Sequence, residues 1–118
     1  MVRSTVPRQG DIYSIDPNPT AGRELRDLHF FVVISPQAIN RLGVCMTVPI
    51  TTGGGAARDM GIAFPITGNR TNGVALCNQV RTFDLAERAR IGTARYVETL
   101  DGDTTRGIAG VVVSILEA

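Results

Sequence analysis

Short apolar runs rich in β-branched residues recur along this chain, and each is bounded by glycine, proline or asparagine. This pattern is typical of β-strands joined by tight turns in a small all-β domain. The run HFFVVIS at 29–35 is apolar almost throughout and predicts a central strand covered on both faces. The run at 11–16 alternates apolar and polar residues, as a half-buried strand does. Further strands are predicted at 44–51, 61–67 and 73–79.

The segments between these runs carry turn and loop residues. GNRTNG at 68–73 predicts a hairpin turn, because Gly and Asn tolerate positive φ. The glycine-rich stretch 52–60 predicts a flexible loop. Pro49 and Pro65 indicate strand ends, bulges or edges, since proline cannot donate to a β-ladder.

Two short helices are predicted inside the chain. One covers 35–40, with Ser35 as its cap and Pro36 at its first helical position. The other covers 84–90 and is capped by Asp84.

The last segment, 100–118, predicts a longer helix that lays one apolar face on the strands. Its apolar residues recur near helical spacing, although Gly107, Gly110 and three consecutive valines lower helix propensity. These apolar residues are Leu100, Ile108, Val111, Val112, Ile115 and Leu116. The architecture expected is mainly β, a small and strongly curved β-barrel with short helices and a C-terminal α-helix.

The length of 118 residues fits one domain with a single core. No apolar run approaches the ~18 to 20 residues of a membrane span. The segment 1–10 lacks the apolar core of a signal peptide. We therefore expect a cytoplasmic protein with no membrane partner.

The two cysteines, Cys45 and Cys77, lie in apolar segments, where a reduced thiol behaves as a small hydrophobic side chain. Neither has a second cysteine or a histidine at ligand spacing. We expect both to be structural, with no metal site and no cofactor.

The 12 basic residues of the chain are all arginines, and the net charge is only +1. Arginine grips phosphate with a planar fork of donors and stacks on bases, which suits contact with RNA. A GC-rich genome produces the same bias, so the arginine content alone does not decide the partner.

Four stretches of the chain, in order and with few gaps, resemble the MazF/PemK family of toxins from toxin–antitoxin pairs. They are GDIYSIDPNPTAGRE (10–24), VVISPQAIN (32–40), VPITTGG (48–54) and NGVALCNQVRTFD (72–84). The resemblance implies that residues 1–118 form one toxin domain with an SH3-like, CcdB/PemK-type barrel that forms a homodimer.

The resemblance also implies an activity, the sequence-specific cleavage of single-stranded RNA without metal. The RNA 2′-hydroxyl attacks its own phosphodiester and leaves a 2′,3′-cyclic phosphate and a 5′-hydroxyl. This chemistry needs a base near the 2′-oxygen, an acid near the leaving oxygen and donors facing the phosphorane charge. A cognate antitoxin protein neutralises such a toxin.

The chain departs from the family at the positions that carry the chemistry. The family usually has Arg-Pro where this chain has His-Phe at 29–30, and that arginine is a catalytic candidate together with the threonine that matches Thr51. In the PemK branch a His, an Arg and an Asp are implicated, and their positions hold Arg23, Leu76 and Asn78 here. Only Thr51 keeps the family identity, so the catalytic set is either rearranged or lost.

His29 is the only histidine in the chain, and its side chain type exchanges protons near neutral pH. A histidine in place of an arginine can preserve activity by shuttling protons. The alternative is that His29 caps the strand through a backbone hydrogen bond. The residue type and its place in the family frame leave these two interpretations about even.

The loop after Thr20 contributes two further candidates. Arg23 can bind the scissile phosphate, and it cannot act as a base because it stays protonated. Glu24 can orient His29 or act as a surface carboxylate. The competing interpretation of this loop pairs Arg23 or Arg26 with Glu24 or Asp27, and for Arg26 we prefer it.

Thr51 is expected to donate its hydroxyl to a non-bridging phosphate oxygen, or else to satisfy a backbone group at the end of its strand. Arg58, in the loop predicted at 52–60, is a candidate contact to the RNA backbone. Asn78, Gln79 and Arg81 carry the amide and guanidinium groups that read base edges. For Gln79, a buried amide that bridges two strands is an equal alternative.

Three functions follow from these residues. The leading hypothesis is an endoribonuclease toxin in which His29, Arg23 and Thr51 are catalytic. The second is a catalytically altered or inactive family member that still binds antitoxin and RNA. The third, a gyrase poison similar to CcdB, ranks last, because those proteins carry an aromatic C-terminus and this chain ends SILEA and has no tryptophan.

Overall fold

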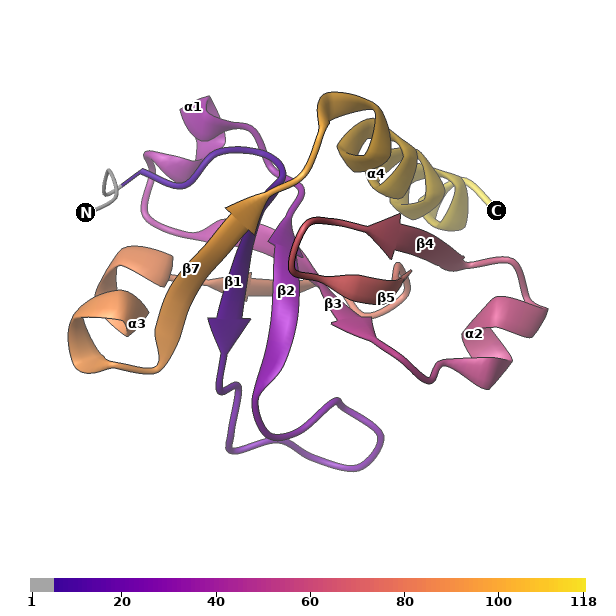
Figure 1. The fold of residues 1–118 in the computed structure, drawn as a ribbon, viewed down its shortest axis with the longest axis horizontal. Coiled ribbons are helices and arrows are strands. Elements are labelled where there is room, and N and C mark those ends of the chain that lie inside the picture. The colour runs from indigo at the N-terminus through magenta and orange to yellow at the C-terminus, as the bar shows by residue number, and fades with distance from the viewer. Residues whose placement is uncertain (1–5) are drawn as a thin grey trace.

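A computed structural model describes residues 6–118 as one antiparallel sheet with four helices around it (Figure 1). Residues 1–5, the first part of the segment expected to lack a signal peptide, lie outside the described residues. The strands are β1 (Asp11–Ile15), β2 (His29–Val33), β3 (Cys45–Thr51), β4 (Ala63–Thr67), β5 (Asn72–Leu76), β6 (Arg81–Phe83) and β7 (Ala94–Thr99). The helices are α1 (Gln37–Asn40), α2 (Gly55–Asp59), α3 (Leu85–Ile91) and α4 (Gly102–Leu116).

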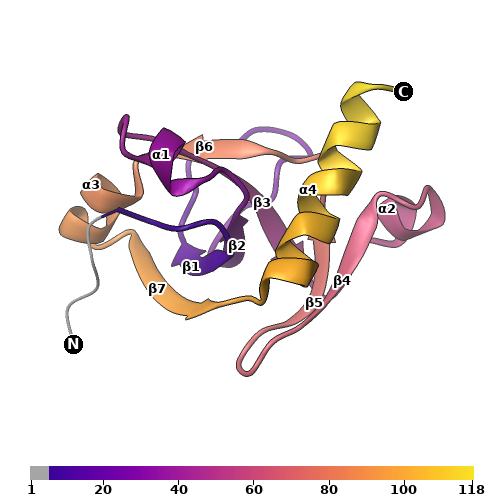
Figure 2. The same cartoon turned by 90° about the horizontal axis from the view of Figure 1, so that it is seen from above.

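The strands follow the order β4-β5-β3-β2-β1-β7, and β6 pairs with β3 beside β5. Figure 2 shows this sheet curling around the core, with α4 across its open side. The mainly β fold with short helices and a C-terminal helix is confirmed. The barrel predicted from the sequence is not closed by strand pairing within residues 6–118, because the path ends at β4 and at β7.

All five predicted strands are present, with shifted ends, but β6 and β7 were not predicted. β7 has the sequence ARYVET and lies at one end of the sheet. An edge strand of this kind buries little and carries polar side chains, so it lacks the apolar pattern that identified the others. β6 is only three residues long, which is too short to show any pattern.

Two predictions about the short helices are wrong. Ser35 does not cap α1; its hydroxyl oxygen accepts the Met46 N–H at 2.9 Å, and Pro36 stands at the cap position itself. The stretch 52–60 is not wholly a loop, because α2 forms within it. Its alanines and Arg58 are good helix formers and follow a glycine with positive φ.

One predicted cap and most of one predicted helix face are found. The Asp84 carboxylate accepts the Glu87 N–H at 3.0 Å at the start of α3. In α4, Ile108 and Val112 are buried against the sheet, as the helical spacing predicted. Leu116, predicted on the same face, is 78% exposed, because the helix end projects beyond the sheet. No helix within residues 6–118 is long and apolar enough to span a bilayer.

The two prolines of the sheet lie in different environments. Pro65 is in β4, the last strand of the sheet, as predicted. Pro49 lies inside β3, where no strand end or edge occurs. On the side away from β2, β3 pairs with β6 over residues 45–47 and with β5 over residues 50–51. Pro49 falls in the gap between these two partners, where no strand needs its N–H.

Apolar side chains cover both faces of the sheet. One cluster lies between the sheet and α4; its buried members are Ile12, Val32, Ile34, Val48, Ile50, Ile66, Ala75, Cys77, Leu100, Ile108 and Val112. The other lies on the opposite face, with Tyr13, Ile15, Phe31, Val33, Cys45, Phe83, Leu85 and Ala94. The successive residues Val32 and Val33 are both fully buried, which confirms the prediction of a central strand covered on two sides.

The cysteines are buried free thiols, one in each cluster. Burial raises the pKa of Cys77 to about 11. Burial, followed by the carboxylates of Asp84 and Asp11, raises the pKa of Cys45 to about 11. Thiols of this kind are poor nucleophiles, so both cysteines are structural, as the sequence indicated.

These thiols predict a loss of stability in alkali. The unfolded chain ionises its thiols near pH 9.0, whereas the folded chain keeps them neutral up to about pH 11. Their contribution to stability is therefore complete below pH 9.0 and is lost as the pH rises toward 11. Urea unfolding across this range should show the fall. The free energy of unfolding should fall less steeply with pH for the double variant Cys45→Ala/Cys77→Ala. Equal slopes for the two proteins would contradict the raised thiol pKa values.

Candidate functional site

The connection from β1 to β2, residues 16–28, has a structure of its own. Asn18 and Asp27 close its base: the Asn18 Nδ2 donates to the Asp27 carboxylate at 3.1 Å, and the Asp27 N–H donates to the Asn18 Oδ1 at 3.0 Å. Nearer the tip, the Glu24 carboxylate accepts the Ala21 N–H at 2.8 Å. These bonds hold the loop in one shape although most of its side chains are exposed.

The ion pairs that the sequence suggested for this loop are replaced by other contacts. Glu24 and Asp27 accept hydrogen bonds from Ala21 and Asn18, respectively. The Arg26 guanidinium donates to the Gly22 carbonyl at 3.4 Å. Arg23 is exposed and lines a pocket, which leaves its guanidinium accessible to a ligand.

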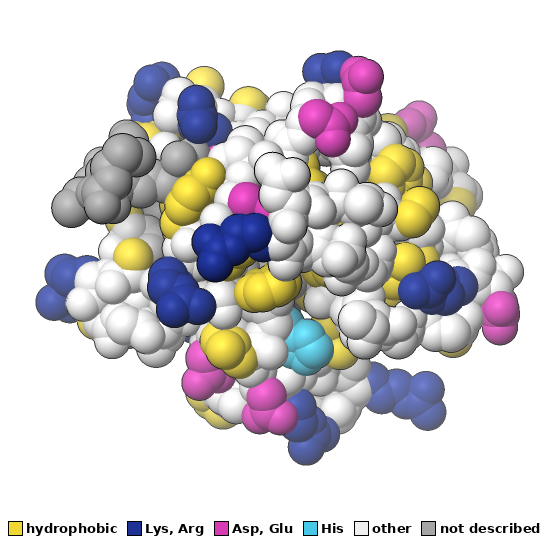
Figure 3. All heavy atoms as spheres, in the orientation of Figure 1, with side chains coloured by type: hydrophobic (Ala, Val, Ile, Leu, Met, Phe, Trp, Pro, Cys, Tyr) yellow, Lys and Arg dark blue, Asp and Glu magenta, His cyan; other side chains and the backbone are white. Residues whose placement is uncertain are grey.

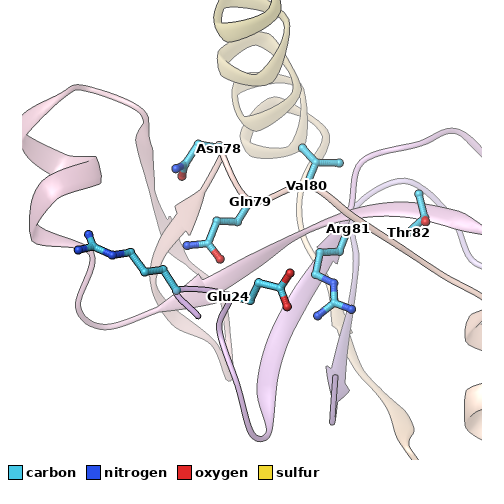
Figure 4. A pocket seen from close by; sticks show the side chains of 7 residues that line it. Glu24, Asn78, Gln79, Val80, Arg81 and Thr82 are labelled. Carbon is cyan, nitrogen blue, oxygen red and sulfur yellow. The ribbon is translucent and has the colours of Figure 1, made fainter. Parts of the chain in front are cut away.

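A first pocket, the Arg81 pocket, forms where this loop meets the segment between β5 and β6. It has a volume of ≈ 680 Å³ and is lined by Arg23, Glu24, Asn78, Gln79, Val80, Arg81 and Thr82. Figure 4 shows Gln79 and Arg81 extending from one segment, with the Glu24 carboxylate between them in this view. Four predicted binding residues, Glu24, Asn78, Gln79 and Arg81, thus lie together with the predicted catalytic Arg23.

Arg81 has the most unusual environment in this pocket. Its guanidinium lies 5.0 Å from the centre of the Phe83 ring, and Phe83 is buried. One guanidinium nitrogen, Nη1, is buried and has no hydrogen-bond partner among residues 6–118. A buried donor without an acceptor is costly. A ligand cannot reach Nη1 unless the side chain shifts, whereas the rest of the half-buried guanidinium lines the pocket and can donate to an acceptor oxygen, such as that of a phosphate or the carbonyl edge of a base.

A second pocket, the His29 pocket, lies at the start of β2. It has a volume of ≈ 330 Å³ and is lined by Ser14, Leu28, His29, Phe30, Ile50, Thr51, Thr52 and Asn72. Its wall combines apolar rings and chains with hydroxyl, amide and imidazole groups. In Figure 3 the histidine is visible at the molecular surface. His29 is half-buried, so its ring contacts the fold and still reaches solvent.

Strand register brings His29 and Thr51 to the same place. β2 and β3 are antiparallel, with Phe30 opposite Ile50 and Phe31 opposite Pro49. The first residue of β2, His29, therefore meets the last residue of β3, Thr51. Two candidates separated by more than twenty positions in the sequence thus share one pocket.

Thr51, which lines this pocket, makes close contacts with the backbone of Gly53 and Gly73. The Thr51 hydroxyl oxygen accepts the Gly53 N–H at 3.2 Å, so the backbone role considered for Thr51 is present. That bond uses the oxygen as acceptor, and the hydroxyl hydrogen can still be donated to a ligand. Gly73 has φ 138°, and a Cβ there would lie only 2.5 Å from the Thr51 carbonyl oxygen. Glycine is thus required where β5 passes Thr51.

Three predicted site residues are placed apart from His29 and Thr51. Arg23, predicted to be catalytic together with them, lines the Arg81 pocket and not the His29 pocket. Arg58 lies on α2, is exposed and donates to the Gly53 carbonyl at 3.0 Å; it lines neither pocket. Glu24 lies in the Arg81 pocket and not in the His29 pocket, so the structure does not place it to orient His29.

The structure adds residues that the sequence reading missed. Ser14, Thr52 and Asn72 line the His29 pocket, and Thr82 lines the Arg81 pocket. Asn72 was assigned only to a turn, and the other three carried no signal beyond a polar side chain in or beside a strand. Within residues 6–118, no three His, Cys, Asp or Glu side chains gather as metal ligands.

Residues 8–116 match the family described as the PemK-like, MazF-like toxin of type II toxin–antitoxin systems. The chain belongs to this toxin family. The endoribonuclease PemK of Escherichia coli is 36% identical over 95 residues, which cover 78% of this chain and 71% of that protein. The endoribonuclease toxin ChpB of E. coli K12 is 38% identical over 99 residues, covering 80% of this chain and 85% of that protein.

Solved structures of the same toxin family share the fold. MazF from Deinococcus radiodurans superposes with a TM-score of 0.78 at 23% identity, over 96% of this chain and 98% of that chain. MazF in a MazE–MazF complex from the same organism gives a TM-score of 0.73 at 24% identity, over 95% of this chain and 96% of that chain. At these identities the likeness concerns the fold alone, and it confirms the PemK-type architecture expected from the sequence.

The close approach at Gly73 predicts a local loss of stability on substitution. Gly73→Ala should cost about 1–3 kcal/mol for backbone strain alone, and the clash with the Thr51 carbonyl should add to it. Gly92→Ala is the matched control, because Gly92 also has positive φ (88°) but has open space at its Cβ position. Urea unfolding should show a clearly larger loss for Gly73→Ala, and equal losses would contradict the described contact.

Proposed function

We propose that this protein is a sequence-specific endoribonuclease toxin that cleaves single-stranded RNA without a metal ion, and that residues 1–118 act as one toxin domain. The observation that carries the proposal is the meeting of His29 and Thr51 in an open pocket at the paired ends of β2 and β3. The family relatives PemK, ChpB and MazF are named endoribonucleases, which supports the same activity here.

The proposed reaction is an internal transfer within the RNA. The 2′-oxygen forms a bond to phosphorus as the bond from phosphorus to the 5′-oxygen breaks. His29 takes the proton of the 2′-hydroxyl, and the leaving 5′-oxygen gains a proton from the imidazolium or from solvent. Thr51 donates its hydroxyl hydrogen to a non-bridging oxygen, where negative charge develops. The products are a 2′,3′-cyclic phosphate and a 5′-hydroxyl.

The Arg81 pocket is proposed to hold the RNA beside the scissile bond. Arg23 is exposed on the loop and can bind a phosphate, and the half-buried Arg81 guanidinium lines the same pocket as a second donor. Gln79 and Asn78 offer amides suited to base edges, and Glu24 offers an acceptor to a base N–H. Arg58 keeps at most a contact to the RNA backbone outside both pockets.

A second candidate function is a family member that binds RNA and antitoxin but no longer cleaves. The position of the PemK-branch arginine holds Leu76, which is only 5% exposed and cannot act on a phosphate. Asn78 stands at the position of the aspartate. If the PemK-type set alone could support catalysis, this chain would be inactive.

Cleavage in the presence of EDTA distinguishes the two functions. The pure protein should cut an RNA pool in EDTA and leave cyclic phosphate ends. His29→Ala should lower kcat by about 10²–10⁴-fold, the usual contribution of a general acid–base group. Arg106→Ala, on the exposed side of α4, is the control and should cleave at the wild-type rate. Intact RNA at high protein concentration would support the inactive member, and an undiminished His29→Ala variant would exclude proton transfer by this residue.

The same assay separates binding from chemistry. Arg81→Ala should raise KM for RNA more than it lowers kcat, because this side chain is proposed to hold substrate and not to exchange protons.

We further propose that the protein is cytoplasmic, forms a homodimer and is neutralised by a cognate antitoxin. The antitoxin partner is supported by the MazE–MazF complexes among the related structures. Dimer formation is supported by exposed apolar residues around α1 and the start of β3. They are Ile39 at 47%, Leu42 at 84%, Val44 at 50% and Met46 at 40% exposed.

Light scattering coupled to gel filtration tests the dimer. The wild-type protein should elute with twice the chain mass, and Leu42→Asp should shift it to the monomer because a charge would be buried in the interface. Met60→Asp, at an exposed apolar residue after α2, is the control and should remain a dimer. A wild-type monomer at micromolar concentration would refute the proposal.

A further inference from the structure

The two ends of the sheet are joined by a carboxylate and not by strand pairing. The path of strands ends at β4 and at β7. Figure 2 shows the turn of the β4–β5 hairpin beside β7. The Glu98 carboxylate of β7 spans this gap: Oε1 accepts the Asn69 N–H at 2.9 Å, and Oε2 accepts the Arg70 N–H at 2.8 Å.

The hairpin turn is shaped to receive this carboxylate. The Gly68 N–H donates to the Thr71 carbonyl at 2.8 Å and closes the turn. A Cβ on Gly68 would lie 2.8 Å from the Glu98 Oε1 and 3.0 Å from Oε2, so any other residue there would force the carboxylate to shift.

The electrostatics of Glu98 agree with this geometry. Partial burial alone would raise its pKa, but the Thr71 side chain, the N–H groups of Arg70 and Asn69 and the charge of Arg70 outweigh burial. The net pKa of Glu98 is lowered, so the carboxylate is ionised when it binds the turn.

We call the contact of the Glu98 carboxylate with the Asn69 and Arg70 N–H groups the clamp. The turn that the clamp holds leads directly into the His29 pocket. β5 begins at Asn72, which follows the turn and lines that pocket with His29 and Thr51. The next residue, Gly73, lies against the Thr51 carbonyl. Any movement of the turn therefore moves one wall of the pocket relative to His29, which lies on a different strand.

We propose that Glu98 is a positioning residue that closes the gap between the two edges of the sheet and fixes the Asn72 wall of the His29 pocket. It acts through two backbone N–H groups and touches no substrate. The positioning part rests on the proposed cleavage of RNA, whereas the clamp itself does not.

Two variants disturb the clamp in different ways. Glu98→Gln keeps one acceptor oxygen but turns an NH₂ group toward the second N–H, so one bond is lost. Gly68→Ala keeps the carboxylate and displaces it with a methyl group. Asp103→Asn is the control for the loss of charge, because Asp103 is an exposed carboxylate on α4 that pairs with Arg106.

Amide hydrogen exchange and cleavage kinetics are measured on the wild type, the two clamp variants, their double variant and Asp103→Asn. The Asn69 and Arg70 amides should be protected in the wild type and in Asp103→Asn, and exchange faster in both clamp variants. In both clamp variants kcat for RNA cleavage should fall by about 10- to 100-fold, the effect of moving a site group by about an ångström. KM should change little. The double variant Glu98→Gln/Gly68→Ala should be no slower than the worse single variant, because both remove one interaction.

Two results would overturn the proposal. Unprotected Asn69 and Arg70 amides in the wild type would remove the clamp. Clamp variants that lose thermal stability but keep the wild-type kcat would reduce Glu98 to a structural role. A wild type that protects these amides but leaves RNA intact would instead remove the proposed function and uphold the clamp, so the two failures are distinguishable.

Discussion

The register of β2 on β3 is the constraint on which the candidate site depends. Phe30 opposite Ile50 and Phe31 opposite Pro49 bring His29 to Thr51. A slip of one residue would turn every side chain of β2 to the other face and break both apolar clusters. The register is therefore set by burial in the core, and the polar groups at the strand ends take their places as a result.

β3 links the two pockets because it has three partners. β2 runs along one of its sides, while β6 and β5 share the other. Thr47 is paired with Arg81, which lines one pocket, and Thr51 lines the other. Pro49 separates the two pairings. The Glu98 carboxylate holds the β4–β5 hairpin against β7. Strand pairing therefore fixes the centre of the site, and one carboxylate fixes the hairpin at its edge.

Elements with a strong burial pattern were predictable from the sequence, and elements shaped by distant contacts were not. β2 and the buried face of α4 follow from apolar spacing alone. β7 was missed because an edge strand needs few apolar residues, and Ser35 was assigned to a cap although the fold uses its oxygen for Met46. α2 was missed because its glycines outweighed its helix-forming alanines in the reading of the segment.

The candidate site was partly predictable for the same reason. Residue types and the family resemblance selected Arg23, Glu24, Gln79 and Arg81, and the structure places them in one pocket. The sequence could not show that Glu24 and His29 line different pockets, or that Arg58 bonds to its own loop. Nor could it reveal Glu98, whose partners are backbone groups about thirty residues away.

The central claim is that His29 reaches the reacting 2′-oxygen from an open pocket that it shares with Thr51. A crystal structure with a single-stranded RNA that carries a 2′-deoxy substitution at the cleavage position tests it most directly. The account predicts that an imidazole nitrogen of His29 lies about 2.6–3.2 Å from the place that the 2′-oxygen would occupy, or reaches it through one water. The Thr51 hydroxyl should donate to a non-bridging oxygen of the scissile phosphate. RNA bound with its scissile phosphate remote from both side chains would contradict it.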